Sequence, residues 1–419
     1  MDWSFLIRNN SSLSVSTDTR NLPAGCVFFA LHGERFDGNK FAKQALEQGA
    51  ALAVIDNPEY ALPECTLLVE DTLLALQDLA RAWRRELGLP IIGITGTNGK
   101  TTTKELLATV LSTKYHLHYT QGNLNNQIGV PLTLLQITRA HEMAIVEMGA
   151  SHPGDIKELV DIAEPNFGLI TNVGRAHLEG FGSFEGVQRT KQELYDYLVA
   201  QNGTIFRNTD NPYLAAMHSK AVQEFRSSGV TSEQAQSASE PLNSDFVAYT
   251  TGVMPSGTRL IGAYNAENIS AALCVGEHFG ISREQGLEAI RQYVPTNNRS
   301  QQMQTANNQL IVDAYNANPT SMQAAINAFK GDTYILGAMR ELGEYSHLEH
   351  QNIVNMLAER KADFVFLVGE EYRQTTSPYP IFDRVEELHA YLEQHPLRDR
   401  KILLKGSRST KMETLLDIL

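Results

Sequence analysis

A glycine-rich segment that ends in lysine and threonine is the feature of this sequence with the clearest chemistry. Gly96-Thr97-Asn98-Gly99-Lys100-Thr101-Thr102 follows an apolar run, Ile91 to Thr95, and precedes a stretch with helical periodicity. Glycines let backbone N–H groups converge on phosphate oxygens, and the start of a helix adds a favourable dipole. Lys100 would reach the terminal phosphates of a nucleotide, and the Thr101 hydroxyl would bind Mg²⁺. Ile94 departs from the strict glycine pattern of such loops, and the alternative is a plain turn with a chance lysine. The agreement of strand, glycines, Lys-Thr and helix favours a phosphate site.

Three further side chains could complete such a site. Glu147 ends the apolar run Ala144-Ile145-Val146, which places its carboxylate where parallel sheets bind their ligands, as a metal ligand or as an acid that merely faces solvent. His177 follows another apolar run, and a lone histidine is either a ligand or a structural residue. Lys191 on its own indicates only a solvated surface charge.

Apolar runs alternate with helical stretches through most of the chain, which predicts an α/β fold with mostly parallel sheets covered on both faces. The expected strands are Val27–Leu31, Ala51–Ile55, Ile91–Thr95, Ala144–Met148, Phe167–Thr171, Leu310–Asp313, Tyr334–Leu336, Phe364–Val368 and Ile402–Leu404. Helices are expected over residues 41–48, 74–87 and 101–112, with a last helix after the final strand. Breaks near Gly88 and Asn298 divide the chain into three domains, 1–88, 89–297 and 298–419, and a polar loop is expected between Ser227 and Ser244.

The composition limits the classes of partner. The 419 residues carry a net charge of −13, so the chain lacks the positive field that nucleic acid or an anionic membrane would need. Hydrophobic residues make up 42%, yet no apolar run is long enough to span a bilayer, and no signal peptide is evident. The three cysteines, Cys26, Cys65 and Cys274, lie far apart and are expected to be buried free thiols. These features predict a cytoplasmic protein that binds no nucleic acid and does not insert into membranes.

Several longer motifs give the chain a resemblance to a known family. They are Asp18-Thr19-Arg20, Phe36-Asp37-Gly38, Gly122-Asn123-Leu124-Asn125-Asn126-Gln127-Ile128-Gly129-Val130-Pro131-Leu132-Thr133, Asp313-Ala314-Tyr315-Asn316-Ala317-Asn318-Pro319-Thr320-Ser321-Met322, Glu341-Leu342-Gly343 and Lys405-Gly406-Ser407-Arg408. Together with the phosphate loop they resemble the Mur ligase family over essentially the whole chain. The resemblance implies a small N-terminal α/β substrate domain, a central P-loop-type domain and a C-terminal Rossmann-like domain.

The resemblance also implies an activity. The motifs are most similar to those of the members that use ATP and Mg²⁺ to join D-alanyl-D-alanine to the terminal carboxylate of UDP-N-acetylmuramoyl-tripeptide, in bacterial peptidoglycan precursor synthesis. A carboxylate is a poor acyl donor, so ATP would convert it to an acyl phosphate, which the amine then attacks. We expect a monomer. The third residue of the tripeptide is left open by the sequence.

The family's functional residues fall on matching positions of this chain. The substrate-binding set is Thr19, Arg35 and Phe36 at the UDP end, with Asn125 and Asn126 nearer the sugar and peptide. The ATP-binding set is Gly96, Thr97, Asn98, Gly99, Lys100, Thr101, Thr102, Asn268, Arg299 and Asp313. The metal set is Thr101, Glu147, His177 and Lys191, and the catalytic set is Lys100, Lys191, His177 and Arg299. The resemblance also implies that Lys191 carries a carbamate made from CO₂. The carbamate replaces a cation with an anionic oxygen ligand, which Mg²⁺ prefers.

Three positions depart from the family pattern. Tyr264 stands where histidine is common, Asn298-Arg299-Ser300 replaces a Gly-Arg-apolar run, and Ala338 takes a place often held by aspartate. None is a proposed metal ligand, so they affect only nucleotide binding and domain closure.

Alternatives within and outside the family stay open at this point. The ligase that adds the third peptide residue carries Asp-Asn-Pro-Arg in its last domain, whereas Asp56-Asn57-Pro58 lies in the first segment and is followed by Glu59. Folylpolyglutamate synthases have a similar loop but with Gly-Ser after the lysine. A non-catalytic nucleotide-binding homologue would not need Lys100, Glu147, His177 and Lys191 together. A simple P-loop ATPase would leave the first and third domains unexplained.

Overall fold

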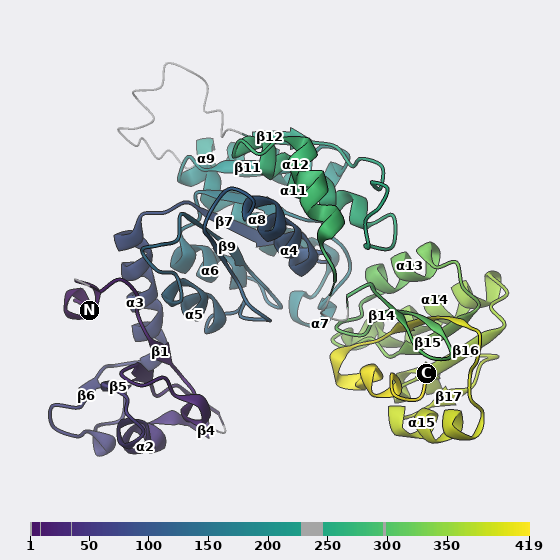
Figure 1. Ribbon diagram of the computed structural model, residues 1–419, viewed down its shortest axis with the longest axis horizontal. Coiled ribbons are helices and arrows are strands. Elements are labelled where there is room, and N and C mark those ends of the chain that lie inside the picture. Colours follow the sequence, from purple (N-terminus) through teal and green to yellow (C-terminus); the bar gives the residue numbers. More distant parts are fainter. Residues whose placement is uncertain (1, 9, 35, 228–245, 296–298) are drawn as a thin grey trace.

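The computed structural model describes residues 2–8, 10–34, 36–227, 246–295 and 299–419, and these form three α/β domains arranged in sequence order (Figure 1). The polar stretch expected between Ser227 and Ser244 lies almost wholly outside the described residues, as does the boundary expected at 297/298. Among the described helices, none combines the length and the apolar character needed to cross a bilayer.

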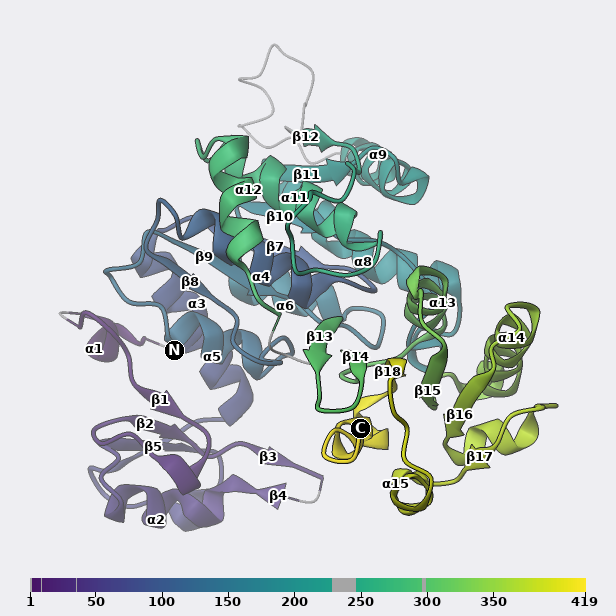
Figure 2. The ribbon, with the colours of Figure 1, turned by 45° about the vertical axis from the view of Figure 1, so that its right-hand side comes forward.

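The N-terminal domain is built on a small parallel sheet of order β1-β2-β5-β6. Its strands are β1 (Val15–Ser16), β2 (Val27–Phe29), β5 (Leu52–Ile55) and β6 (Thr66–Leu68), with helices α1 (Ser4–Ile7) and α2 (Ala42–Glu47) and the turns η1 (Thr19–Asn21), η2 (Gly38–Phe41) and η3 (Pro58–Tyr60). An antiparallel hairpin, β3 (His32–Gly33) and β4 (Phe36–Asp37), projects from this domain toward the side on which the C-terminal domain lies (Figure 2).

Helix α3 (Thr72–Leu87) joins the first two domains. Asp71 caps its start by accepting a hydrogen bond from the backbone N–H of Leu74, and Gly88 ends it in the left-handed conformation. Its apolar face packs on the central domain, where Trp83 Nε1 donates to the carbonyl oxygen of Ile137. The N-terminal domain is therefore attached through a rigid helix.

The central domain holds a six-stranded sheet of order β12-β11-β10-β7-β9-β8, parallel throughout. Its strands are β7 (Ile91–Thr95), β8 (Leu117–Tyr119), β9 (Met143–Glu147), β10 (Phe167–Ile170), β11 (Thr204–Asn208) and β12 (Phe246–Tyr249). The helices are α4 (Lys100–Leu111), α5 (Gly129–Leu135), α6 (Asp155–Ala163), α7 (Leu178–Phe181), α8 (Phe184–Ala200), α9 (Pro212–Ser227), α11 (Asn265–His278) and α12 (Arg283–Gln292). Helices α4, α11 and α12 bury one face of the sheet, and α5, α6, α8 and α9 bury the other. The predicted parallel sheet with two covered faces is confirmed.

The C-terminal domain carries a second six-stranded sheet of order β13-β14-β18-β15-β16-β17, in which only β13 runs antiparallel. Its strands are β13 (Gln301–Gln304), β14 (Gln309–Asp313), β15 (Thr333–Gly337), β16 (Phe364–Val368), β17 (Ile381–Phe382) and β18 (Lys401–Lys405), and its helices are α13 (Pro319–Ala328), α14 (Ser346–Glu359) and α15 (Val385–Gln394). The α/β architecture expected from the alternating pattern is therefore present in all three domains.

Two expectations were wrong. The last helix is replaced by two short 3-10 turns, η6 (Arg408–Thr410) and η7 (Met412–Leu415), because Lys411 between them takes a left-handed conformation (φ 50°) that no α-helix contains. Cys65 is exposed, although Cys26 and Cys274 are buried as expected.

Candidate active site

The glycine-rich loop lies at the carboxyl end of β7 and leads directly into α4. Gly96 and Gly99 both have positive φ angles, 143° and 79°. A Cβ atom on Gly96 would come within 2.0 Å of the Thr171 hydroxyl, and one on Gly99 within 2.6 Å of the Asn268 side-chain oxygen. Only glycine fits at these two positions, so the loop can bring its backbone N–H groups and the first turn of α4 close to an anion.

Lys100 is the cation of this loop. Its Nζ donates to the backbone oxygens of Gly96 at 2.7 Å and Thr97 at 3.1 Å. Burial lowers the pKa of Lys100 to about 8; the positive charge of Arg299 acts in the same direction, and the carboxylate of Glu147 opposes it. The ammonium thus occupies a place where the phosphates of a nucleotide would stabilise it better than two neutral carbonyls do.

Glu147 lies at the end of β9, with only 2% of its surface exposed. One carboxylate oxygen accepts hydrogen bonds from Thr101 Oγ1 at 3.2 Å and Asn125 Nδ2 at 2.9 Å. The other oxygen is buried, and no described residue donates a hydrogen bond to it. A buried carboxylate with a free oxygen beside a threonine hydroxyl fits Mg²⁺, which prefers hard oxygen ligands.

The two remaining proposed metal ligands lie against the same aromatic ring. The imidazole of His177 and the phenyl ring of Phe181 have centroids 6.2 Å apart, and Lys191 Nζ lies 5.6 Å from the Phe181 centroid. Lys191 is buried on α8, contrary to the expectation for an isolated lysine, and it does not line the cleft. Its pKa is well below the ordinary value, first because of burial and then because of the nearby Lys100. An amine that loses its proton readily is nucleophilic enough to react with CO₂.

The amide side chains assigned to substrate are already engaged within the protein. Asn125 Nδ2 holds the carboxylate of Glu147, as described above. Asn126 Oδ1 accepts hydrogen bonds from the backbone N–H groups of Ile128 and Gly129, at 3.2 and 2.9 Å, where α5 begins. Both residues nevertheless line the cleft. The structure therefore gives each an additional role in fixing the site's geometry.

The C-terminal domain faces this site and touches it directly. Asn318 Nδ2 donates to Asn98 Oδ1 in the phosphate loop at 2.8 Å, and the backbone N–H of Arg175 donates to Thr320 Oγ1 at 3.2 Å. The Arg175 guanidinium also pairs with the buried Glu349 at 3.3 Å. A cleft of about 740 Å³ lies between the two domains, within the size range of small-ligand sites.

The nucleotide residues predicted around the loop are brought together in this cleft. Asn268 accepts from Thr103 Oγ1 at 3.1 Å and donates to Asn265 at 2.9 Å, which fixes its amide against Gly99. Asp313, at the end of β14, accepts from Lys405 Nζ at 2.5 Å. Both Asn268 and Asp313 line the cleft.

Arg299 lines the cleft from the first described residues of the C-terminal domain. Its guanidinium stacks on the Tyr315 ring at 4.0 Å, and its Nε is buried without a hydrogen-bond partner among the described residues. A planar cation held in this way suits the charge of a phosphoryl group in transfer.

Tyr315, Asn318, Glu341 and Lys405 are among the cleft residues to which sequence reasoning assigned no role. They lie in three of the motifs that carried the family resemblance, and each of these motifs begins at or shortly after the carboxyl end of a parallel strand, where α/β sheets place ligands. The position of these motifs at the ends of parallel strands was the feature of the sequence that could have identified these residues as part of the site.

Thr19 and Phe36, two of the residues predicted for the UDP end, lie apart from this cleft on the N-terminal domain. Phe36 is 56% exposed, stacks on Phe41 with ring centroids 5.5 Å apart, and lines a second hollow of about 460 Å³. Thr19 lies on η1 and is not among the described residues that line it, and Arg35 lies outside the described residues.

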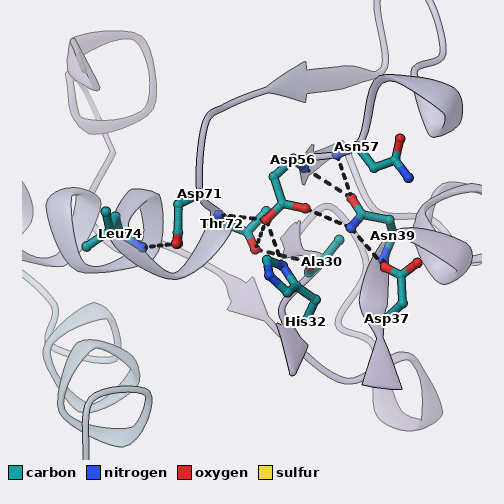
Figure 3. Close-up of polar contacts among 9 residues, drawn as sticks. All are labelled: Ala30, His32, Asp37, Asn39, Asp56, Asn57, Asp71, Thr72 and Leu74. Atoms are coloured by element: carbon teal, nitrogen blue, oxygen red, sulfur yellow. Dashed lines mark hydrogen bonds and ion pairs between the residues drawn. The ribbon is translucent and has the colours of Figure 1, made fainter. Parts of the chain in front are cut away.

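Asp56 is one of the residues that line this second hollow, and its carboxylate lies at the centre of a network of polar contacts (Figure 3). Asp56 accepts hydrogen bonds from Asn39 Nδ2 at 2.8 Å and from Thr72 N and Oγ1 at 3.1 and 3.0 Å, and it contacts His32 Nδ1 at 2.9 Å. Burial alone would raise the pKa of Asp56, but these hydrogen bonds and His32 together lower it below its ordinary value. The network ties the β3–β4 hairpin to the start of α3.

The phosphate loop lies at the end of a parallel sheet, and a second α/β domain faces it across the cleft. This arrangement is typical of nucleotide-dependent enzymes whose active site lies between two domains. Three family models match the chain: "Mur ligase family, catalytic domain" at residues 14–84, "Mur ligase middle domain" at 94–276 and "Mur ligase, glutamate ligase domain" at 298–408. The chain belongs to the Mur ligase family.

Individual relatives cover nearly the whole chain. The UDP-N-acetylmuramoyl-tripeptide–D-alanyl-D-alanine ligase of Bacillus subtilis is 34% identical over 96% of this chain and 92% of its own length. A crystal structure of MurF from Acinetobacter baumannii, 31% identical, covers 96% of this chain and 92% of its own with a TM-score of 0.81. MurF ligase from Thermotoga maritima in complex with ADP, 25% identical, covers 97% of both chains with a TM-score of 0.81.

Proposed function

We propose that this chain joins D-alanyl-D-alanine to the terminal carboxylate of UDP-N-acetylmuramoyl-tripeptide and converts ATP to ADP and phosphate in doing so. The observation that carries the proposal is the convergence of Lys100, Glu147 and Arg299, from two domains, on one cleft. Relatives that carry the name of this activity match 96% of the chain, which includes all three domains. The reaction supplies a precursor of peptidoglycan.

In the first step the acceptor carboxylate attacks the γ-phosphate of ATP, which forms an acyl phosphate and releases ADP. The phosphates lie on the loop Gly96–Thr102, where Lys100 leaves its two carbonyl partners to bind them. Arg299 stabilises the charge on the transferred group. Thr101, Glu147, His177 and a carbamate on Lys191 would hold Mg²⁺, and the ion would screen the repulsion between the two anions.

In the second step the amine of D-alanyl-D-alanine attacks the activated carbonyl through a tetrahedral intermediate, and phosphate leaves. An acyl phosphate hydrolyses readily, so water has to be excluded while the amine arrives. Asn318 contacts the phosphate loop and Thr320 contacts Arg175, and these contacts hold the C-terminal domain against the central domain. Such closure would exclude water from the cleft.

The acceptor is long, and its two ends meet different domains. Its reacting carboxylate belongs in the cleft near Asn125 and Asn126, and Asn268 and Asp313 contact adenosine there. The uridine nucleotide end binds the N-terminal domain through Thr19, Arg35 and Phe36. The exposed Phe36 ring, supported by Phe41, offers an aromatic surface to such a ligand.

Other aspects of the proposal follow from the chain's architecture. We infer domains at 1–88, 89–297 and 298–419, which serve the acceptor, ATP and the amine. We infer a monomer, because two domains of a single chain are sufficient to enclose the cleft. ATP and UDP-linked sugars are cytoplasmic substrates, which supports a cytoplasmic location.

The ligase that adds a diamino acid as third residue is the nearest rival. Its Asp-Asn-Pro-Arg element has no counterpart in the C-terminal domain here: Asp56–Pro58 lies in the N-terminal domain, and a second Asp-Asn-Pro, Asp210–Pro212, lies in the central domain before Tyr213. This distribution favours the dipeptide as amine.

Phosphate release tests the proposal directly. We expect release only when ATP, a UDP-N-acetylmuramoyl-tripeptide and D-alanyl-D-alanine are all present, and a panel of tripeptides that differ in the third residue identifies the acceptor. Release without the amine or the acceptor would indicate a simple ATPase. Release with free diaminopimelate or lysine in place of the dipeptide would support the rival ligase.

A further inference from the structure

The strongest unassigned feature of the cleft is a contact between a proposed metal ligand and the opposite domain. The carboxylate of Glu341, which follows β15 in the C-terminal domain, lies against Nδ1 of His177 at the start of α7 in the central domain. We propose that Glu341 is a positioning residue that fixes the His177 imidazole for the divalent cation. This inference rests on the proposed function, because it takes His177 as a cation ligand.

The chemistry of imidazole gives the contact its meaning. A neutral histidine carries one proton on its two ring nitrogens and binds a metal through the other nitrogen. Glu341 at Nδ1 draws the proton to that nitrogen and leaves the lone pair of Nε2 free. Histidine ligands in metal sites regularly use a carboxylate in this way, and loss of the carboxylate weakens the metal site.

The backbone on both sides of the contact is held in an unusual conformation. His177 and Glu341 both have positive φ angles, 50° and 61°, and glutamate has no intrinsic preference for this region. The carbonyl oxygen of Glu341 also accepts from the backbone N–H of Glu179 at 3.5 Å, and Gly343 packs against the Glu179 side chain. The loop after β15 is therefore shaped to meet the turn that carries His177.

Because the two residues belong to different domains, the contact exists only when the C-terminal domain lies over the cleft. The cation site would then be completed by domain closure, which ties cation binding to the geometry that also excludes water. The domains have other contacts that do not involve Glu341, namely Asn98 with Asn318 and Arg175 with Glu349. When Glu341 is removed, these contacts still hold the two domains together. Removal of Arg175 breaks a contact between the domains without touching His177, and it is therefore a matched control.

The test is Mn²⁺ binding to the full-length protein, followed by electron paramagnetic resonance without nucleotide, acceptor or amine. Glu341→Gly removes the carboxylate, and glycine readily adopts the left-handed backbone conformation of this position. Glu341→Gln keeps an oxygen that can accept a hydrogen bond from the Nδ1–H group of His177. We expect Glu341→Gly to weaken Mn²⁺ binding about tenfold or more, Glu341→Gln to restore part of that loss, and Arg175→Gln to bind Mn²⁺ as the wild type does.

Two results would overturn the proposal. Unchanged Mn²⁺ affinity in Glu341→Gly would show that His177 needs no partner, and an equal loss in Arg175→Gln would show that the carboxylate acts only by holding the domains together. Thermal unfolding of each variant establishes that it is folded. Since the Mn²⁺ assay contains no substrate, a failed ligation assay with the expected Mn²⁺ effects would count against the proposed function and leave the role of Glu341 standing.

Discussion

Removal of the loop cation is the sharpest perturbation of the proposed reaction. Lys100→Ala deletes the ammonium that now has two carbonyl partners, at 2.7 and 3.1 Å, and that would move to the phosphates of bound ATP. Preorganised contacts of this kind typically stabilise a transition state by about 3–4 kcal/mol. At 1.36 kcal/mol per decade, the loss corresponds to a decrease of about 10²–10³-fold in kcat/KM.

The same substitution should leave the fold intact. Burial disfavours the Lys100 ammonium in the ligand-free protein more than the Glu147 carboxylate favours it, and Arg299 adds to the cost, so the fold does not depend on this charge. Lys114→Ala, an exposed lysine just beyond α4, is the matched control and should retain full activity. The assay is steady-state phosphate release with all three substrates, together with thermal unfolding. A folded Lys100→Ala protein within tenfold of the wild type would refute the assignment of the loop.

Three further predictions concern the acceptor, the metal site and pH. Thr19→Ala should raise KM for the UDP-linked acceptor and leave KM for ATP unchanged in steady-state titrations; an equal rise for both would mean that the N-terminal domain is wrongly assigned. Lys191→Ala should be nearly inactive and be partly rescued by acetate or formate in an activity assay, whereas near-normal activity in CO₂-free buffer would argue against a carbamate. The pKa of Lys100 is about 8 without phosphate, so ATP should bind with full affinity below pH 8 and more weakly as the pH rises through that value. Calorimetry should detect proton uptake when ATP binds, and Lys100→Ala should abolish this uptake.

The sequence was most informative where function depends on local spacing. The strand Ile91–Thr95, the loop glycines and the helix that follows lie within a few residues of one another, so hydrophobic periodicity and glycine placement were sufficient to predict them. Glu147 was predicted for the same reason, because the end of a parallel strand is a recognisable position.

Features that join distant segments could not be predicted. Asn98 and Asn318 are hydrogen-bonded although 220 positions separate them, and no pattern in the sequence relates them. The contact of His177 with Glu341 depends likewise on how two domains meet. Lys191 resembled a surface lysine because its burial is determined by the packing of α8 against α6, α9 and β10, not by its immediate neighbours in the sequence.

The most direct test of the central claim follows an oxygen atom. The terminal carboxylate of the tripeptide acceptor is labelled with ¹⁸O, the full reaction is run in unlabelled water, and the released phosphate is analysed by mass spectrometry. Attack of the carboxylate on ATP, followed by amine attack on the acyl phosphate, transfers one labelled oxygen to each phosphate. Phosphate that contains no ¹⁸O would show that the acceptor carboxylate is never phosphorylated, which would contradict the acyl-phosphate mechanism.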